Sequence, residues 1–199
     1  MLSQVSWPPG RPANGARQGL GWRAKKARRK LHPLPILDNL EALVDLGRGR
    51  KRPGLLALDV SKRAIGIAGA DASWQLATPL RTIRRRRLEQ DLAALGEVVR
   101  ERGAGALVIG WPLNMDGSEG HRCQSVRAFA EQLDAAQGLP MLLWDERLTT
   151  FAAQEVAAEA GLRSKRHTKA LDALAAATIL QDTLDAVARR GRRGLCREP

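Results

Sequence analysis

Short apolar runs, separated by turns or by segments with helical spacing, constrain the fold of this 199-residue chain most strongly. Three runs follow one another directly, and two more alternate with helical segments. The expected strands are residues 55–59, 64–68, 74–77, 106–109 and 141–144, and the expected helices are residues 84–101, 123–136, 150–160 and 169–187. Three consecutive strands followed by helix-separated strands imply an α/β fold, in which helices pack on the faces of a mixed five-stranded sheet.

The positive charge of the chain lies outside this α/β region. The formal net charge is +12, but residues 1–53 hold 12 Lys or Arg against 3 acids, and residues 186–199 hold 5 against 1. Residues 54–185 are nearly neutral, with 16 basic and 17 acidic side chains. Basic tails favour binding to a polyanion, because neutralised phosphates release their counterions. They are equally compatible with a role in solubility or with an arginine-rich coding bias.

The chain is therefore expected to form one domain between two basic tails. Residues 1–53 are expected to be a largely disordered extension, since their first 35 residues are rich in Pro and Gly and have no hydrophobic period. A short helix is expected within residues 36–44. The domain is expected over residues 54–188, followed by a basic tail at residues 189–199.

Composition also narrows the class of protein. The two cysteines have no metal-ligand spacing, which argues against a disulfide scaffold. No run approaches the roughly 20 apolar residues that cross a bilayer, and the N-terminus lacks the apolar core of a signal peptide. We expect a cytoplasmic protein with no membrane partner, although an amphipathic organellar targeting segment is compatible with this composition.

Acidic residues occupy three places where an α/β fold keeps its chemistry. Asp59 ends the first apolar run, and Asp145 and Glu146 directly follow the last one. Asp172 lies in a helical segment that is otherwise nearly all Ala, Leu and Ile. Carboxylates gathered at one place repel one another, so a hard cation such as Mg²⁺ or Mn²⁺ is their natural partner. The acids therefore suggest a divalent-metal site.

Each acid also has a purely structural interpretation. Asp59 can initiate a turn, and Glu146 can form a surface ion pair with the arginine that follows it. Asp145 can cap the helix expected at residues 150–160. Asp172 can point to solvent, but its apolar neighbours favour burial, where an unpaired carboxylate is costly.

Polar residues near the same strand ends could hold a phosphate or a sugar. Lys62 and Arg63 lie in the turn after the first strand, and a merely solvated turn is equally expected there. Asn114 lies in a loop, residues 110–117, whose backbone amides could contribute; the alternative is an ordinary Gly/Pro loop. His121 has no ligand-spaced partner and is interpreted as a loop residue.

At these residues the chain resembles the YqgF/RuvX family, whose members look like Holliday-junction resolvases of the ribonuclease H-like superfamily. The matching segments are ALDVSKRAIGIAGAD from Ala57, VIGWPLNMDGSEGHRCQSVRAFAEQL from Val108, and WDERLTTFAAQEVAAEAGLRSKRHTKALDALAAATILQDTLD from Trp144. Three ordered motifs spanning most of residues 55–185 are far more specific than any one of them. One departure is Ser61, which stands where the family usually has glycine, a residue suited to positive φ or close backbone approach.

The resemblance implies a ribonuclease H-like fold and a metal-dependent endonuclease. By that resemblance Asp59, Glu146 and Asp172 are the catalytic and metal-binding carboxylates, with Asp145 able to take the role given to Glu146. Two metal ions about 4 Å apart would activate a water and stabilise the leaving oxygen. The residues expected to bind substrate are Lys62, Arg63, Asn114 and Arg147.

The family is associated with processing the 5′ end of precursor 16S ribosomal RNA. The expected activity is therefore cleavage of structured RNA, with precursor ribosomal particles as possible partners. The alternatives are a Holliday junction resolvase acting on branched DNA and a non-catalytic nucleic-acid-binding assembly factor. All three acids are present, which favours the enzyme over the binder. The sequence does not distinguish RNA from DNA, one metal from two, or a monomer from a homodimer.

Overall fold

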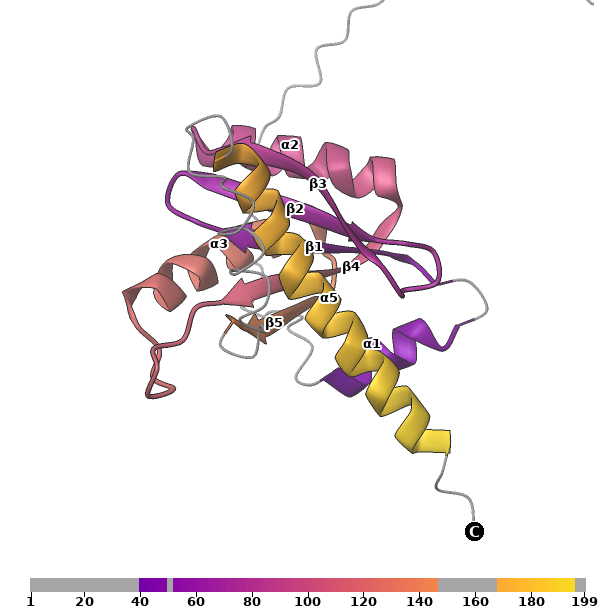
Figure 1. Ribbon diagram of the computed structural model, residues 1–199. Coiled ribbons are helices and arrows are strands. Elements are labelled where there is room, and N and C mark those ends of the chain that lie inside the picture. The colour runs from indigo at the N-terminus through magenta and orange to yellow at the C-terminus, as the bar shows by residue number, and fades with distance from the viewer. Residues whose placement is uncertain (1–39, 50–51, 147–167, 196–199) are drawn as a thin grey trace, which may run out of the picture. The chain divides into compact units, whose positions relative to one another are not determined.

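The computed structural model describes residues 40–49, 52–146 and 168–195 (Figure 1). Its elements are α1 Leu40–Gly47, β1 Gly54–Val60, β2 Ala64–Ala70, β3 Ala77–Arg84, α2 Leu88–Arg102, β4 Ala104–Trp111, α3 His121–Gln137, β5 Met141–Asp145 and α5 Thr168–Leu195. Two glycines in the left-handed region end the helices that connect the strands. Gly103 (φ 56°) follows α2, and Gly138 (φ 64°) follows α3.

The five strands form one mixed sheet in the order β3-β2-β1-β4-β5. Strand β2 runs antiparallel to both of its neighbours, while β4 pairs in parallel with both β1 and β5. The predicted α/β fold, a mixed five-stranded sheet flanked by helices, is therefore confirmed. Strands β1, β3, β4 and β5 share one direction, and their carboxyl ends meet at the same edge of the sheet.

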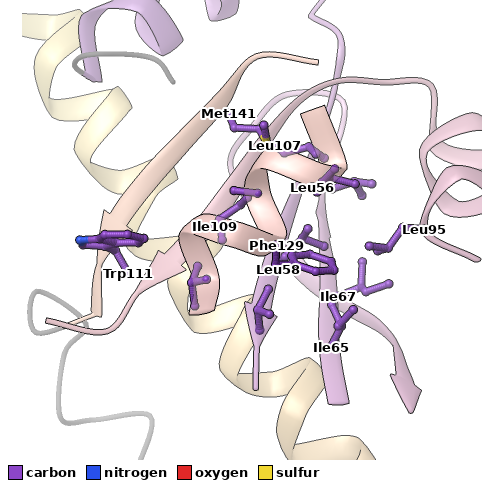
Figure 2. Close-up of a cluster of buried hydrophobic side chains, with 14 of the residues drawn as sticks. Leu56, Leu58, Ile65, Ile67, Leu95, Leu107, Ile109, Trp111, Phe129 and Met141 are labelled. Atoms are coloured by element: carbon purple, nitrogen blue, oxygen red, sulfur yellow. The ribbon is translucent and has the colours of Figure 1, made fainter. Parts of the chain in front are cut away.

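Side chains alternate between the two faces of the sheet, and a separate hydrophobic cluster covers each face. On one face, large side chains from β1, β2 and β4 pack against α2 and α3; Figure 2 shows Leu58, Ile67 and Ile109 with Leu95 of α2 and Phe129 of α3. The other face is covered by α5, which crosses the sheet diagonally, and by α1 (Figure 1).

The face under α5 is built from smaller side chains. Ala57, Ala68 and Ala106 of the sheet lie buried with Ala176 and Ala177 of α5. Small residues on both sides allow a helix axis to approach a sheet closely. The part of α5 that carries Asp172 therefore lies against the strands.

The third strand lies later in the chain than predicted. We expected residues 74–77, but β3 spans Ala77–Arg84, and the helix expected from residue 84 begins at Leu88. Trp74 instead occupies a tight turn with φ 56°, and its side chain is 4% exposed. Its indole packs under Gly47 of α1 and donates a hydrogen bond to the Pro53 carbonyl oxygen, 3.0 Å away. The indole is buried because of this packing, not because it belongs to a strand.

The other predicted strands match to within a few residues, and the helix expected at residues 150–160 lies outside the described residues. Helix α1 and the end of α5 both lie outside the domain predicted at residues 54–188. Leu43 of α1 is fully buried against the α5 face, so the body includes part of the predicted 1–53 extension. Helix α5 continues to Leu195, through most of the predicted tail at 189–199. Among the described residues, no helix is both long and apolar enough to cross a membrane.

Candidate active site

The three predicted carboxylates come from three different elements. Asp59 is the penultimate residue of β1, Glu146 directly follows β5, and Asp172 lies near the start of α5. Asp59 points to the same face of the sheet as Ala57, the face that α5 covers. Three segments far apart in sequence thus bring acids to one edge of the sheet.

Glycines flank Asp59 on both neighbouring strands. Gly66 of β2 is its register partner, and Gly110 of β4 follows the pair formed by Leu58 and Ile109. The sheet therefore presents a row in which a carboxylate stands between two residues without side chains.

This absence of side chains makes room for the other two acids. A Cβ at Gly66 would overlap the main-chain oxygen of Asp172, and a Cβ at Gly110 would lie 2.6 Å from Glu146 Oε1. Both approaches are too close for a real Cβ atom. The glycines thus allow α5 and the Glu146 carboxylate to lie beside Asp59.

Burial raises the pKa of all three carboxyl groups, and repulsion by a neighbouring acid raises it further for Asp59 and Glu146. For Asp59, burial is the larger cause of the raised pKa and the charge of Asp172 the next. For Glu146, burial again comes first, followed by the charge of Asp59 and, more weakly, that of Asp145. Burial also raises the pKa of Asp172. Asp59 is therefore the central member of an electrostatically coupled series, Asp172, Asp59 and Glu146, which we call the acid row.

Two arginines partly offset this repulsion. The charge of Arg122, near the start of α3, lowers the pKa of both Asp59 and Glu146. The charge of Arg84, the last residue of β3, lowers the pKa of Asp172. Burial and repulsion outweigh both arginines, because all three carboxyl pKa values stay above their ordinary range. The acid row has an excess of negative charge that a cation could neutralise.

The acid row does not form a complete three-ligand cage. Within the described residues, no group of three or more His, Cys, Asp or Glu side chains converges tightly enough to hold a metal ion. Mg²⁺, however, is commonly held by one or two carboxylates together with waters and substrate phosphates. Either acid pair that includes Asp59 supplies such donors. The chemistry of the donors therefore fits a divalent cation, and the three-residue ligand set stays a prediction.

A pocket of about 370 Å³ opens beside Glu146. Its lining residues are Pro112, Leu113, Asn114, Gly120, His121, Arg122 and Glu146. The Asn114 side chain donates a 2.9 Å hydrogen bond to Ser118 Oγ, and a Cβ at Gly120 would lie 2.9 Å from Asn114 Oδ1. The loop is thereby held against the start of α3. A larger pocket, about 920 Å³, lies at the opposite edge of the sheet and contains none of the predicted site residues.

Comparison with known proteins identifies the family. The model of the family RuvX, described as Holliday junction resolvase, matches residues 54–186. The chain belongs to the RuvX family. Its members are nucleases, hydrolases that act on phosphodiester bonds, so the predicted family and enzyme class are confirmed.

Two curated relatives agree with this membership. A protein of Roseobacter denitrificans named "Putative pre-16S rRNA nuclease" is 48% identical over 135 residues, which cover 67% of this chain and 83% of that protein. A protein of the same name from Rhodobacter capsulatus is 48% identical over 149 residues, 74% of this chain and 94% of the relative. Among solved structures, RuvC from T. thermophilus in complex with Holliday junction substrate aligns with a TM-score of 0.47 and 15% identity, covering 70% of this chain and 96% of RuvC.

Hydrogen bonds of Ser61 close the turn after β1. The Ser61 hydroxyl donates a 2.9 Å hydrogen bond to the Ala64 carbonyl oxygen and accepts one of 3.0 Å from the Ala64 N–H. Trp74 is the only non-glycine residue with positive φ in the described part of the chain, so Ser61 needs no left-handed backbone. Lys62 and Arg63 are exposed at the tip of this turn, at the same edge as Asp59.

The structure adds residues that sequence reasoning missed. His121 is not a loop residue: it begins α3 and lines the pocket beside Glu146. Arg122 and Arg84 act on the acid row from elements distant in sequence. Their only signal in the sequence was the position of a basic side chain where a strand or loop meets a helix. Arg147, predicted to bind substrate, lies outside the described residues.

Proposed function

We propose that this RuvX family member is a divalent-metal-dependent endonuclease that cleaves precursor 16S ribosomal RNA. The observation that carries the proposal is the acid row, three partly buried carboxylates with raised pKa at the carboxyl edge of a ribonuclease H-like sheet. Repulsion between these carboxylates costs free energy, and carboxyl groups with shifted pKa values are concentrated at functional sites. In a nuclease family, such acids can bind a cation next to a phosphodiester. The names of the two relatives support RNA as the substrate.

Different residues would bind the metal ion, the phosphate and the nucleotide. Asp59 with Glu146 or Asp172 would hold Mg²⁺ or Mn²⁺ through carboxylate oxygens. When bound, such an ion supplies Lewis acidity toward the attacking water and the leaving oxygen. Arg122 and Arg84 flank the row and would neutralise phosphate oxygens. Asn114 and Arg147 would orient the nucleotide beside Glu146.

Glu146 is the residue best placed to move a proton. Because burial and the neighbouring acids raise its pKa, its carboxylate is a better proton acceptor than an ordinary glutamate. It also faces the 370 Å³ pocket, where a water and a nucleotide can approach it. We propose that Glu146 accepts a proton from the attacking water on a carboxylate oxygen.

Cleavage of a DNA junction is the second candidate, and the description of the matching family favours it. A labelled precursor 16S RNA and a labelled four-way DNA junction should be incubated side by side, with Mn²⁺ and with chelator. We expect Mn²⁺-dependent cleavage of the RNA alone. Cleavage of the junction alone would reverse the order of the two candidates, and binding without any cleavage would indicate a non-catalytic assembly factor.

Asp59→Asn tests the acid row in the same assay, since it removes charge at nearly constant volume. The matched control is Asp45→Asn, which changes an exposed acid on α1 that pairs with Arg48. We expect cleavage to fall at least about a hundredfold in Asp59→Asn and to persist in Asp45→Asn. Wild-type cleavage by a folded Asp59→Asn protein would contradict the proposed site.

The proposal extends to the organisation and surroundings of the chain. We propose that residues 1–39 form a basic extension that contacts RNA outside the nuclease domain, in a cytoplasmic enzyme acting on precursor ribosomal particles. The support is their charge, 8 Lys or Arg against 1 acid. Size-exclusion chromatography with light scattering would decide between monomer and homodimer.

A further inference from the structure

We propose that a basic ridge beside the acid row binds the phosphate backbone of the RNA substrate and sets its path across the site; this inference rests on the proposed nuclease function. The ridge lies where the β1–β2 turn meets the junction of β3 and α2. Its exposed side chains are Lys62, Arg63, Arg84, Arg86 and Arg87. Three of these five, the arginines of the β3–α2 junction, were not among the residues predicted to bind substrate.

A single arginine ties the two parts of the ridge together. The Arg85 guanidinium donates a 3.1 Å hydrogen bond to the Ser61 carbonyl oxygen and lies 5.1 Å from the centre of the Phe129 ring. Its Nε lies 3.5 Å from Oδ2 of Asp91, whose side chain is 3% exposed. The Arg85 main-chain N–H also donates to the Arg63 carbonyl oxygen at 3.0 Å. The turn and the junction therefore form one rigid unit.

This arrangement leaves the neighbouring charges available. Asp91 is occupied on both oxygens, because its Oδ1 accepts the Arg86 main-chain N–H at 3.0 Å. Within the described ranges, no hydrogen bond or ion pair involves the side chains of Arg84, Arg86 or Arg87. The exposed acid nearest in sequence is Glu89, in the first turn of α2. Arg85 thus serves the fold, Arg84 is exposed and acts on the charge of Asp172, and Arg86 and Arg87 are exposed on a rigid support.

The ridge begins next to the acid row. Thr82 lies across Gly66 from Asp59, and Arg84 lies two residues further along β3, toward the shared edge. Two strand spacings place Arg84 about 10 Å from β1 across the sheet. A phosphate a few nucleotides from the scissile bond along the same strand would therefore reach the ridge.

Continuity with the acid row favours a nucleic-acid backbone over an acidic protein surface. The scissile phosphodiester must lie at the acids, and the strand leaving them meets either Arg122 or the ridge. Residues 54–185 are nearly neutral as a whole, yet five basic side chains gather at this one place. Preorganised charge at this position would orient the RNA as well as attract it.

The test is the double variant Arg86→Gln/Arg87→Gln, with Arg189→Gln/Arg192→Gln at the far end of α5 as the control matched in charge. Both pairs are exposed. Binding of a precursor 16S RNA fragment is measured by fluorescence anisotropy from about 50 to 200 mM KCl, in an Asp59→Asn background that does not cleave. We expect the slope of log affinity against log salt to become shallower by about 1 for each phosphate that the ridge variant no longer neutralises, and to stay unchanged in the control. In the cleaving background, KM should rise while kcat at saturating RNA stays unchanged.

An unchanged salt slope in the ridge variant would contradict the proposal and is the result expected if the ridge binds an acidic protein instead. An equal loss of RNA affinity in the ridge variant and the control variant would also contradict it. The proposed function can fail separately, because it depends on cleavage by the wild-type chain and not on these slopes. Thermal melts verify that each variant is folded. If Arg86→Gln/Arg87→Gln does not fold, Lys62→Gln/Arg63→Gln in the turn provides the same test on the other half of the ridge.

Discussion

At the scale of single residues, Asp59 determines the electrostatics of the candidate site. It is coupled to Asp172 on one side and to Glu146 on the other, and it is held on a central strand that cannot move away. A carboxyl group whose pKa is raised by folding binds its proton more tightly in the folded chain than in the unfolded chain. Replacing one acid of the row by a neutral side chain should therefore increase the free energy of unfolding at a pH where that acid is ionised.

We expect Asp59→Asn to be more stable than the wild type at pH 7 in chelator. The contribution of the raised pKa is fully present below the unfolded value, near 3.8, and is lost as the pH rises through the folded pKa. Asn does not titrate, so the wild type should lose more stability than the variant between about pH 4 and 7, by about 1.4 kcal/mol for each pH unit by which folding raises the pKa of Asp59. Urea unfolding across this range measures both curves. Parallel curves would show that the pKa of Asp59 is not raised.

Asp172→Ala separates a metal ligand from a structural aspartate. Mn²⁺ at about a hundred times its Kd should stabilise the wild type by about 2.7 kcal/mol, because only the folded chain presents the acid row. The variant should lose most of this gain and should be neutral or slightly stabilised without metal, since a half-buried, repelling charge is removed. Thermal melts over a Mn²⁺ titration give the answer, with Asp185→Ala on the exposed side of the same helix as control. Destabilisation in chelator with an unchanged Mn²⁺ response would exclude Asp172 from the site.

At the scale of elements, the site depends on how closely α5 approaches the sheet. Gly66 lies directly below Asp172, and the alanine-rich surfaces around it continue the same close packing. The helix backbone cannot yield locally, because its hydrogen bonds fix it. A side chain at this glycine would push the start of α5, and the carboxylate it carries, away from Asp59.

Gly66→Ala should therefore lower the free energy of unfolding by about 1–3 kcal/mol or more and abolish cleavage. The control is Gly191→Ala, further along the same helix, where an added Cβ meets nothing within 4 Å. That change should be neutral or stabilise the chain by up to about 1 kcal/mol, because alanine is the better helix former. Urea unfolding and the RNA cleavage assay test both variants. A Gly66→Ala protein with wild-type stability and activity would refute this account of the close approach.

At the scale of the whole molecule, α1 packs under α5 although its residues were predicted to belong to the extension at residues 1–53. The fully buried Leu43 belongs to the cluster under α5, and Glu41 forms an exposed ion pair with Arg190 of that helix. Residues 1–39, ahead of α1, carry 8 of the 12 basic side chains of this region. Most of the positive charge of residues 1–53 therefore lies ahead of the packed helix α1 in the sequence.

Two truncations distinguish these contributions. Deleting residues 1–39 should keep stability within about 0.5 kcal/mol while weakening RNA binding and reducing its salt slope, since 8 basic residues are removed. Deleting residues 1–53 should in addition cost several kcal/mol, because burial of Leu43 and Val44 is worth about 1.5–3 kcal/mol each. Urea unfolding and anisotropy measure the two effects. An unchanged salt slope after the first deletion would show that the extension does not touch the RNA.

The sequence by itself determined the fold class, most strand positions and the acids Asp59, Glu146 and Asp172 as candidates, because hydrophobic period and motif spacing are local properties. It misplaced the third strand, since Trp74 looks like a strand residue until its packing partners are known. Only the tertiary structure decided that Gly66 and Gly110 make room for the acids, and that Arg84 and Arg122 reach them. Those relations depend on register and on the approach of α5, which join residues far apart along the chain. No local pattern encodes such distances, because they result from the packing of whole elements against one another.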